Sequence, residues 1–484
     1  MTDTVGALVA EHAHTRADAI AFVDATSGES MTWRDYDTHA NAIAAGLVAA
    51  GYGRGDRYAL QLADGPAVHA AYVGCERAGL VTVGIGPRAG AREVGHLVGR
   101  TGAVALAPTI AAIPVGDPAT RTDRGLGPDD LWMLNSTSGT TGLPKCVMHA
   151  QRRWFEFHRL AVEAADLTSD DVFASALPAP FGFGLWTAHF TPELAIEAIE
   201  RHRVTVLAVV STQFVMMLNS PALDRHDLSS LRVLFTGGEM VPPDRAAEFE
   251  ARTGARVLQF YGSNETGALS CTTVRDDDTV RLHTAGHAIA SMNVRLFDPD
   301  TGADVTATGG PGIGACRGPL TCLGYWDDVE ANTELVPADG WMRTGDIVTM
   351  DTDGVVRVRG RASDFIIRGG KNISAAYVEE EVGSHPAVAL CAAVAAPDPV
   401  FGERVCCFAV LRSDHATLTL DDLTAHLAAR GTGKEHWPEL LVVVDGDLPR
   451  SSGGKVAKGE LRERARHHIS SSNATSASEP PVGT

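Results

Sequence analysis

The sequence predicts an α/β protein with a large N-terminal domain, a small β-rich subdomain and a smaller α+β domain at the C-terminus. Three observations carry this prediction. Helical and strand patterns alternate through about the first 260 residues, which is typical of mixed or parallel sheets flanked by helices. From about residue 280, turn signals recur roughly every 8–12 residues, as in antiparallel β structure. A shorter α/β pattern starts after residue 363, and 484 residues are enough for two or more domains.

The N-terminal pattern predicts its elements in order. Residues 32–52 place apolar side chains at helical spacing with a glycine near the end, and two short apolar runs, 57–63 and 103–108, indicate buried strands. The following pattern predicts strands at 131–137, 204–211, 231–239 and 257–262, with helices at 212–220 and 242–254. This alternation implies strands that run mainly parallel, with helices on both faces of the sheet.

The C-terminal half has a different texture. Strand-forming residues and turn residues are interspersed in 294–302, 321–327 and 340–361, and we expect these stretches to form the β-rich subdomain. The last residues, 469–484, are mostly Ser, Thr, Asn, Ala, Pro and Gly, and we expect a disordered tail there.

The composition excludes several function classes. The formal net charge of −19 argues against nucleic acid or an anionic membrane as the main partner. No basic, apolar secretory start and no apolar stretch of about 20 residues is present, so neither export nor a membrane span is expected. The eight cysteines form no C-x-x-C pair and no zinc-spaced cluster with histidine, which predicts reduced thiols in a cytoplasmic protein.

One stretch, Ser136–Lys145 (STSGTTGLPK), has the composition of a phosphate-binding loop. It follows a predicted strand, where successive backbone N–H groups can form an anion-binding concavity. It is not the common P-loop, because Leu143 and Pro144 separate Gly142 from the lysine. The sequence therefore predicts a phosphate site of another kind.

Four further segments combine glycine with a charged side chain. They are Tyr261–Gly267 (YGSNETG) with Glu265, RTGD ending at Asp346, GRASDFIIRGG with Arg361 and the pair Gly369–Gly370, and LPRSSGGKV with Lys455. Together with the loop, these segments resemble in their order the adenylate-forming superfamily of acyl-CoA synthetases, firefly-type luciferases and peptide-synthetase adenylation domains. The resemblance runs from about residue 30 to about residue 465.

The resemblance implies an enzyme that uses ATP to activate a carboxylate by attack on the α-phosphorus, with release of pyrophosphate. The loop would then wrap the β- and γ-phosphates of the leaving group, and its glycines would let the backbone approach closely. The loop residues implied are Thr137, Ser138, Gly139, Thr140, Thr141, Gly142 and Lys145. Thr141 is counted with Lys455 and Glu265 as catalytic.

The remaining motif residues also take their roles from the resemblance. Glu265 would be the Mg²⁺ ligand, and Lys455 would contact the reacting carboxylate and the α-phosphate. Tyr261 would stack on adenine opposite Gly237, Gly238 and Glu239, with Gly262, Ser263 and Asn264 in the same nucleotide-binding segment, while Asp346 would accept from the ribose hydroxyls and Arg361 would reach ribose or phosphate. Lys458, close to Lys455, is expected at the surface.

The resemblance further implies two domains that move against each other. The expected division is an adenylation domain at 1–362, a mobile lid at 363–468 and the tail at 469–484. Ser363 occupies the hinge position, where the family usually has Asp or Lys. After adenylation the lid would rotate, withdraw the lysine and present the face around Gly369–Gly370 to a pantetheine tunnel.

The acyl pocket is expected in LPAPFGFGLW (Leu177–Trp186). Its aromatic residues Phe181, Phe183 and Trp186, with Gly237, resemble the pocket of benzoate-type CoA ligases. No aspartate is present to pair with a substrate ammonium, which predicts a compact, apolar acid, aromatic or cyclic. The segment after Phe190 is shorter than is usual in the family.

Three hypotheses stay open at this point. The first is a CoA ligase that uses ATP, Mg²⁺ and coenzyme A. The second is a stand-alone enzyme that loads an acyl or aryl group onto the phosphopantetheine of a carrier protein. The third is a non-catalytic or repurposed relative, such as a binding protein, an enzyme that adenylates something other than a carboxylate, or one with an unusual nucleophile. A monomer or a homodimer in the cytoplasm is expected.

Overall fold

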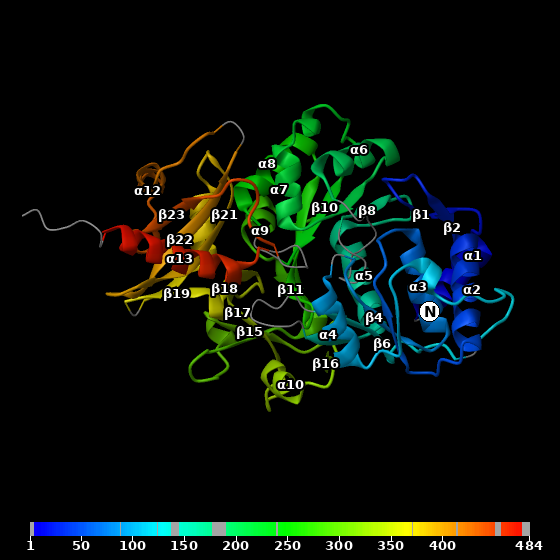
Figure 1. Cartoon of the computed structure of the whole chain (residues 1–484). Coiled ribbons are helices and arrows are strands. Elements are labelled where there is room, and N and C mark those ends of the chain that lie inside the picture. Colours follow the sequence, from blue (N-terminus) through cyan, green and yellow to red (C-terminus); the bar gives the residue numbers. More distant parts are fainter. Residues whose placement is uncertain are drawn as a thin grey trace, which may run out of the picture. The chain divides into compact units, whose positions relative to one another are not determined.

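The computed structural model describes residues 4–87, 89–122, 124–136, 145–176, 190–238, 241–369, 371–412, 415–450 and 456–476, and many of its helices and strands are labelled in Figure 1. The chain divides into two compact units. The first comprises Met1–Arg295, Ala315–Thr344 and Asp353–Val356, and the second comprises Leu296–Gly314, Gly345–Thr352 and Arg357–Thr484. Within the described ranges, no helix combines the length and the apolar character that a membrane span requires.

One mixed sheet of the first unit has the strand order β16-β7-β6-β4-β3-β5. The strands are β3 (Arg57–Leu60), β4 (Val81–Gly84), β5 (Ala105–Ala107), β6 (Leu131–Ser136), β7 (Cys146–Ala150) and β16 (Gly324–Tyr325). β3 to β6 pair in parallel, whereas β7 is antiparallel to β6 and β16. β6 and β7 are therefore neighbours in the sheet, and the glycine-rich stretch of the sequence connects them.

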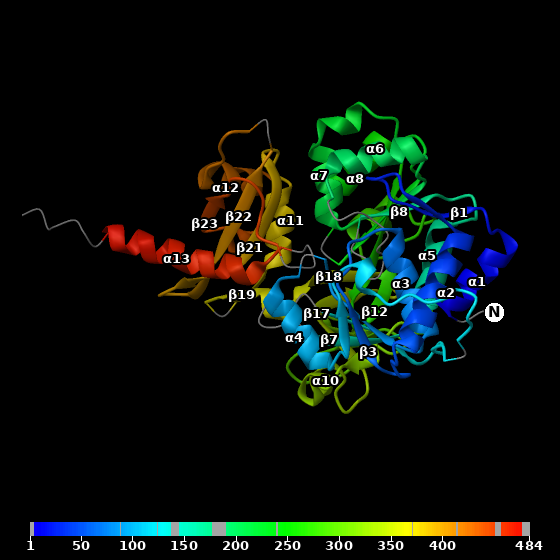
Figure 2. The ribbon, with the colours of Figure 1, turned by 45° about the vertical axis from the view of Figure 1, so that its right-hand side comes forward.

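Helices cover both faces of this sheet (Figure 2). They are α1 (Val5–Thr15), α2 (Trp33–Ala49), α3 (Pro66–Arg77) and α4 (Ala91–Thr101). α2 and α3 bury their apolar sides against one face, α1 packs against them, and α4 lies on the other face. α2 begins where the sequence predicts, because Thr32 and Asp35 form a capping box at its N-terminus. A short antiparallel ribbon of β1 (Ile20–Val23) and β2 (Ser30–Thr32) precedes it.

A second mixed sheet of the first unit has the order β13-β12-β11-β10-β9-β8. Its strands are β8 (Phe173–Ser175), β9 (Val206–Ala208), β10 (Val233–Gly237), β11 (Arg256–Ser263), β12 (Gly267–Cys271) and β13 (His287–Ala288). β8 to β11 are parallel and β11 to β13 antiparallel. The helices are α5 (Arg152–Ala165), α6 (Pro192–His202), α7 (Ser211–Asn219), α8 (Pro243–Thr253), α9 (Asp278–His283) and α10 (Val329–Leu335). α5 packs on one face of the sheet, and α6, α7 and α8 pack on the other.

The second unit is built around the sheet β20-β19-β22-β21, to which β23 adds beside β22. The strands are β19 (Phe365–Arg368), β20 (Lys371–Ser374), β21 (Val388–Asp398), β22 (Gly402–Leu411) and β23 (Leu440–Val443), and the helices are α11 (Ala375–Gly383), α12 (Leu420–Ala429) and α13 (Lys458–Ser476). α11 and α12 contribute to one apolar core of the sheet and α13 to the other. The unit boundary runs through the small sheet β14 (Arg295–Phe297), β15 (Gly312–Cys316), β17 (Met342–Met350) and β18 (Val356–Arg361), most of whose residues belong to the second unit.

The predicted fold class is confirmed, with mixed sheets flanked by helices in the first unit and a smaller α+β second unit. The expected domain boundary between residues 362 and 363 stays a prediction. In the structure, residues 296–314 and 345–352 belong to the same compact unit as the C-terminal residues. The tail expected to be disordered from residue 469 was placed too early: α13 continues to Ser476. After Gly459, in the first turn of α13, the sequence contains no proline or glycine before Pro480, and the ion pair Arg464–Glu460 supports the helix at i,i+4 spacing.

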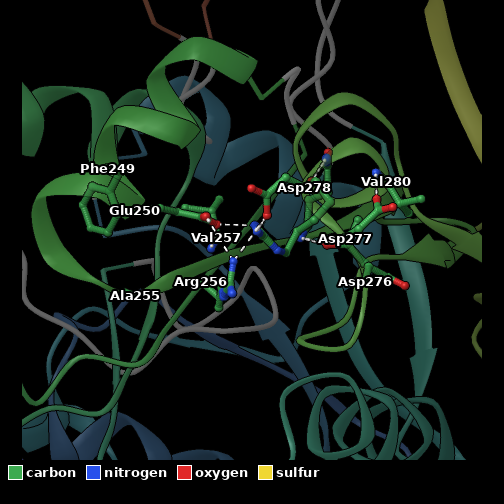
Figure 3. Close-up of polar contacts among 12 residues, drawn as sticks. Phe249, Glu250, Ala255, Arg256, Val257, Asp276, Asp277, Asp278 and Val280 are labelled. Carbon is green, nitrogen blue, oxygen red and sulfur yellow. Dashed lines mark hydrogen bonds and ion pairs between the residues drawn. The ribbon is translucent and has the colours of Figure 1, made fainter.

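A buried arginine fixes the strand that leads to the predicted nucleotide site. Arg281, whose side chain has no exposed surface, makes ion pairs with Glu250 on α8 and with Asp278 on α9. Figure 3 labels these two carboxylate residues together with Arg256 and Val257. Glu250 also accepts a hydrogen bond of 2.8 Å from the backbone N–H of Val257 on β11. The ion pairs therefore tie two helices and β11 together.

Replacing Arg281 by methionine should lower the free energy of unfolding by about 3 kcal/mol, because it leaves the mostly buried Glu250 carboxylate without its buried partner. For a unit of this size that is a fall of roughly 4 °C in the midpoint of thermal unfolding. The matched control is Arg256→Met, since Arg256 contacts the same carboxylate but its side chain is 51% exposed, and exposed pairs contribute only about 0–1 kcal/mol. Equal shifts in the two variants would contradict the structural role of Arg281.

Candidate active site

The hairpin between β11 and β12 presents Glu265 at a tightly closed turn. The Ser263 hydroxyl accepts hydrogen bonds of 3.1 Å from the backbone N–H groups of Glu265 and Thr266, and the Thr266 hydroxyl accepts one of 3.0 Å from the N–H of Ser263. These hydroxyl groups replace the backbone partners that a turn lacks. The order Ser-Asn-Glu-Thr therefore closes the turn locally and fixes the backbone from which the Glu265 side chain extends.

Two of the predicted glycines are required by close backbone approach. A Cβ on Gly262 would lie 1.7 Å from the carbonyl oxygen of Gly267 across the hairpin, and one on Gly237 would lie 2.5 Å from the carbonyl oxygen of Phe260. Any larger residue would have to displace the backbone at these positions. The parallel register pairs Gly237 with Phe260, so the carboxyl end of β10 lies beside the residue that precedes Tyr261. Tyr261 itself is partly buried against the core of the second sheet.

Glu265 and Lys145 meet at a tyrosine that the sequence analysis did not assign to the site. The Tyr325 hydroxyl donates a hydrogen bond of 2.8 Å to Glu265 Oε1. The Lys145 Nζ lies over the ring of the same tyrosine, 4.8 Å from its centroid. Two predicted site residues that are 120 positions apart in the printed sequence are thus brought together.

A buried polar network joins the end of β6 to the Glu265 turn. Arg153 donates to His149 Nδ1 at 2.6 Å, and His149 Nε2 lies 2.8 Å from Asn135 Oδ1. Because Nδ1 accepts, Nε2 carries the ring hydrogen and donates it to Asn135. Asn264, next to Glu265, donates to the same Asn135 oxygen at 2.8 Å. Asn135 directly precedes Ser136, so the network fixes the start of the predicted loop relative to the turn.

The charge state of this network follows from its burial. Burial, together with the positive charge of Arg153, holds the pKa of His149 well below its usual value, so the imidazole is neutral. Burial also lowers the pKa of Arg153 to about 10, with the Glu265 and cysteine groups opposing that shift, so the guanidinium remains charged at neutral pH. A buried positive charge therefore lies behind the turn that carries Glu265, a second feature that the sequence did not predict.

Glu265 fits the role of a magnesium ligand. A hard cation such as Mg²⁺ prefers oxygen donors and is often held by one or two carboxylates together with phosphate oxygens and water. The carboxylate is oriented through Oε1 by Tyr325, and Lys145 lies over the ring of the same tyrosine. Within the described ranges, no cluster of three or more His, Cys, Asp or Glu side chains forms a site that would hold a metal without substrate.

The second unit brings together two other predicted residues. Asp346 on β17 and Arg361 at the end of β18 form an ion pair of 3.4 Å. The Asp346 side chain is 14% exposed and the Arg361 side chain 54% exposed. An oriented carboxylate beside a guanidinium can accept from two vicinal hydroxyls while the cation contacts phosphate. The pair fits the predicted ribose site.

The predicted hinge and one tunnel glycine also lie in the second unit. Ser363 is the middle residue of the 3₁₀ turn Ala362–Asp364, and Asp364 pairs with Arg462 of α13 at 2.6 Å. Gly369 has φ +56° between β19 and β20, and its N–H donates to the Phe401 carbonyl at 2.9 Å. Other short 3₁₀ turns occur at Ile110–Ala112, Pro221–Asp224, Ala290–Met292, Thr306–Thr308 and Lys434–His436.

The expectation of a surface position for Lys458 was wrong. Its side chain is 19% exposed, and its Nζ lies 2.8 Å from Glu379 Oε1 on α11. Burial alone would lower the pKa of Lys458, but the charge of Glu379 and the hydrogen bond to it raise that pKa above its usual value. The lysine is buried because it has a buried carboxylate partner, and it ties α13 to α11.

Several predicted residues lie outside the described residues. They are Thr137, Ser138, Gly139, Thr140, Thr141, Gly142, Glu239, the pocket residues Phe181, Phe183 and Trp186, the tunnel residue Gly370, and Lys455. Gly238, with φ +80°, is the last described residue before Glu239.

Comparison with protein families gives a match over most of the chain. The model of the AMP-binding enzyme family matches residues 9–326, and the model of the AMP-binding enzyme C-terminal domain matches residues 377–455. The glycine-rich loop, the segment with Glu265 and the residue Lys455 fall within these two ranges. The segment ending at Asp346 and the segment with Arg361 and Gly369–Gly370 lie between the ranges.

Two known proteins similar to this chain are named as a CoA ligase and a CoA synthase. A medium-chain fatty-acid–CoA ligase of Escherichia coli strain K12 is 30% identical over 92% of this chain and 88% of the relative. A feruloyl-CoA synthase of an Amycolatopsis species is 33% identical over 90% of this chain and 94% of the relative. Among solved structures, ATP-bound MatB from Rhodopseudomonas palustris has a TM-score of 0.82 and 26% identity, and the match covers 96% of this chain and 99% of that one.

Proposed function

Because this chain belongs to the AMP-binding enzyme family, we propose that it is an ATP-dependent acid–thiol ligase that activates a carboxylic acid as its acyl-adenylate and passes the acyl group to coenzyme A. The observation that carries this proposal is the meeting of Lys145 and Glu265 at Tyr325, beside the point where the glycine-rich loop returns to the sheet. A cation and a carboxylate held together there suit a bound triphosphate with its magnesium ion. The names of the two relatives, a CoA ligase and a CoA synthase, support the same chemistry.

The first half-reaction joins the acid to the α-phosphorus of ATP. A carboxylate oxygen of the acid forms a bond to that phosphorus, and the bond from the α-phosphorus to the bridging oxygen of pyrophosphate breaks. Lys145 and the N–H groups of the loop stabilise the charge on the leaving pyrophosphate. Glu265 would hold Mg²⁺, which offsets the negative charge that gathers on the phosphate oxygens. Lys455 contacts the attacking carboxylate and the α-phosphate, and Asp346 and Arg361 hold the ribose.

The second half-reaction moves the acyl group to sulfur. The thiolate forms a bond to the acyl carbon, the bond from that carbon to the phosphate oxygen breaks, and AMP leaves with the oxygen it received from the acid. In this proposal the chain turns at Ser363 between the two steps, so that the face with Gly369 replaces Lys455 at the acyl-adenylate. A few residues at the ends of elements are sufficient to absorb such a change in φ and ψ.

Replacing Ser363 by proline should separate the two steps. Proline fixes φ near −65°, a value that the 3₁₀ turn containing Ser363 can adopt. A rotation that requires a different φ at residue 363 would then be blocked. Pyrophosphate exchange should be retained, whereas thioester formation should be lost. Ser363→Ala is the matched control, because alanine keeps the backbone freedom and should turn over normally. A Ser363→Pro enzyme with both activities would place the hinge elsewhere.

The substrate class proposed is a compact apolar acid, aromatic or cyclic. Its support is the sequence of the pocket segment, where Phe181, Phe183 and Trp186 occur without a carboxylate. The feruloyl-CoA synthase is named for an aromatic acid, which agrees with this class, and the medium-chain ligase for an aliphatic one. The eight cysteines are all free thiols, which agrees with a reducing compartment, and we place the enzyme in the cytoplasm.

The reaction class can be tested by product analysis. Purified protein is incubated with ATP, Mg²⁺, coenzyme A and a panel of carboxylic acids, and the nucleotides are separated. We expect AMP and pyrophosphate in equal amounts, dependent on the acid. Formation of ADP and phosphate would exclude the proposed reaction. Replacing coenzyme A by a carrier protein that bears phosphopantetheine tests the alternative acceptor, because a carrier-loading enzyme would release AMP faster with the carrier protein than with coenzyme A.

A further inference from the structure

Tyr325 is held rigidly by its own segment. β16 pairs with β7 so that Tyr325 lies opposite Val147, two residues after Lys145. The side-chain amide of Asn332 on α10 accepts from the Tyr325 N–H at 2.6 Å and donates to the Tyr325 carbonyl at 2.8 Å. Both backbone groups of the tyrosine therefore have a fixed partner, and the residue as a whole is 9% exposed, so the side chain starts from a fixed point.

The same segment makes a second contact with Glu265. The backbone N–H of Cys322 donates to the Glu265 carbonyl at 2.7 Å, in addition to the hydrogen bond from the Tyr325 hydroxyl to Oε1. An ordinary buried tyrosine needs one partner for its hydroxyl. Here the partner is the side chain predicted to hold the metal, and the ring face is covered by the lysine predicted to hold phosphate.

The phenol is the donor of this pair. Its hydroxyl lies 2.8 Å from Glu265 Oε1, and an ionised carboxylate oxygen can only accept. A hydrogen bond to a charged acceptor is stronger than one between neutral groups and restricts the rotation of the carboxylate. The ring meanwhile offers Lys145 a face that attracts the ammonium without neutralising it.

We propose that Tyr325 is a positioning residue that sets the Glu265 carboxylate for magnesium and the Lys145 ammonium for the triphosphate before ATP binds. This role rests on the proposed function of the site. The two halves of the side chain have separate tasks: the hydroxyl acts on the metal ligand, and the ring acts on the lysine. Each half can be removed separately by substitution.

The experiment measures ATP binding rather than turnover. Isothermal titration gives the dissociation constant of ATP with excess EDTA and with Mg²⁺, and the ratio of the two constants is the gain due to magnesium. Tyr325→Phe should reduce this ratio by about tenfold, as expected for loss of a hydrogen bond to a charged group. It should leave the constant in EDTA within about twofold, because the ring remains. Tyr325→Leu should weaken binding in EDTA as well.

A double-mutant cycle makes the test specific. Glu265→Gln should lower the ratio at least as far as Tyr325→Phe, and the combined variant should resemble Glu265→Gln alone, because the hydroxyl acts through that carboxylate. Tyr58→Phe, which removes the same atom in the core of the first sheet, is the matched control and should leave the ratio unchanged. The midpoint of thermal unfolding without ligand is recorded for each variant.

The outcomes separate the positioning role from the proposed function. A reduced ratio in Tyr325→Phe with non-additivity toward Glu265→Gln supports the role. ATP binding by all variants with an unchanged ratio in Tyr325→Phe, or strict additivity, would overturn it and leave the ligase intact. Absence of ATP binding in the unaltered chain would overturn the proposed function itself.

Discussion

Replacing Lys455 by alanine should slow acyl-adenylate formation by about 10²–10³-fold, or roughly 3–4 kcal/mol, the usual effect of removing one preorganised donor from a site of developing charge. The lysine stands in the glycine-rich segment SSGGKV, and its proposed partners are the attacking carboxylate and the α-phosphate. Thioester formation from acyl-adenylate supplied to the enzyme should be spared, because the proposed rotation removes Lys455 before that step. The measurement is the rate of each half-reaction in a rapid-quench experiment.

Two other lysines of the second unit serve as controls. Lys434, whose ammonium lies 5.7 Å from the Trp437 ring centroid, should tolerate alanine with both rates intact. Lys458→Ala should lower the stability of the unit instead, because it leaves the buried Glu379 carboxylate without its partner. Equal losses in the two half-reactions of Lys455→Ala would contradict its assignment to adenylation.

A free α-amino acid should be a substrate poorer by at least about 10³-fold in kcat/KM than its deaminated analogue. The pocket segment offers Phe181, Phe183 and Trp186 and no carboxylate, so a buried ammonium would lack a partner, at a cost of several kcal/mol. Each 1.4 kcal/mol corresponds to about a factor of ten. A ring against aromatic side chains adds roughly 0.5–1.5 kcal/mol beyond the area it buries.

The selectivity is measured as kcat/KM for benzoate-like, cyclohexyl, short-chain, long-chain and amino acids under one set of conditions. The shortened segment after Phe190 disfavours long-chain acids, so the ring-containing acids should rank first. A clear preference for a long-chain fatty acid or for a free amino acid would contradict the proposed substrate class.

The sequence predicted the parts of the fold that depend on local pattern. Alternating apolar segments located β3, β5 and β6 of one sheet and β9, β10 and β11 of the other, but not β4, β7, β8, β12 or β13. The start of α2 was predicted because its cap at Thr32 is local. Strand bounds were less well predicted: residues 204–211 were expected to form a strand, whereas β9 covers Val206–Ala208. The apolar run continues past the end of the strand because Val209, the next residue, is also buried. An apolar run therefore identifies buried residues but not the residue at which the strand ends.

The contacts that complete the site could not be predicted in the same way. Tyr325 reaches Glu265 only because β16 pairs with β7, and the two residues are separated by 60 positions. Arg153 follows another arginine at the start of α5, and nothing in that local pattern indicates which of the two is buried. Lys458 was expected at the surface because lysines are rarely buried, and the paired Glu379 lies on a different helix. Such side chains are identified by register and long-range packing.

Attack of the acid on the α-phosphorus of ATP is tested by following the oxygen atoms of the acid into the products. An accepted acid labelled with ¹⁸O in both carboxylate oxygens is converted to the thioester, and the nucleotide product is analysed by mass spectrometry. We expect one ¹⁸O atom in the phosphate of AMP and none in pyrophosphate, because the attacking oxygen leaves with AMP. Label in inorganic phosphate, or unlabelled AMP, would contradict it.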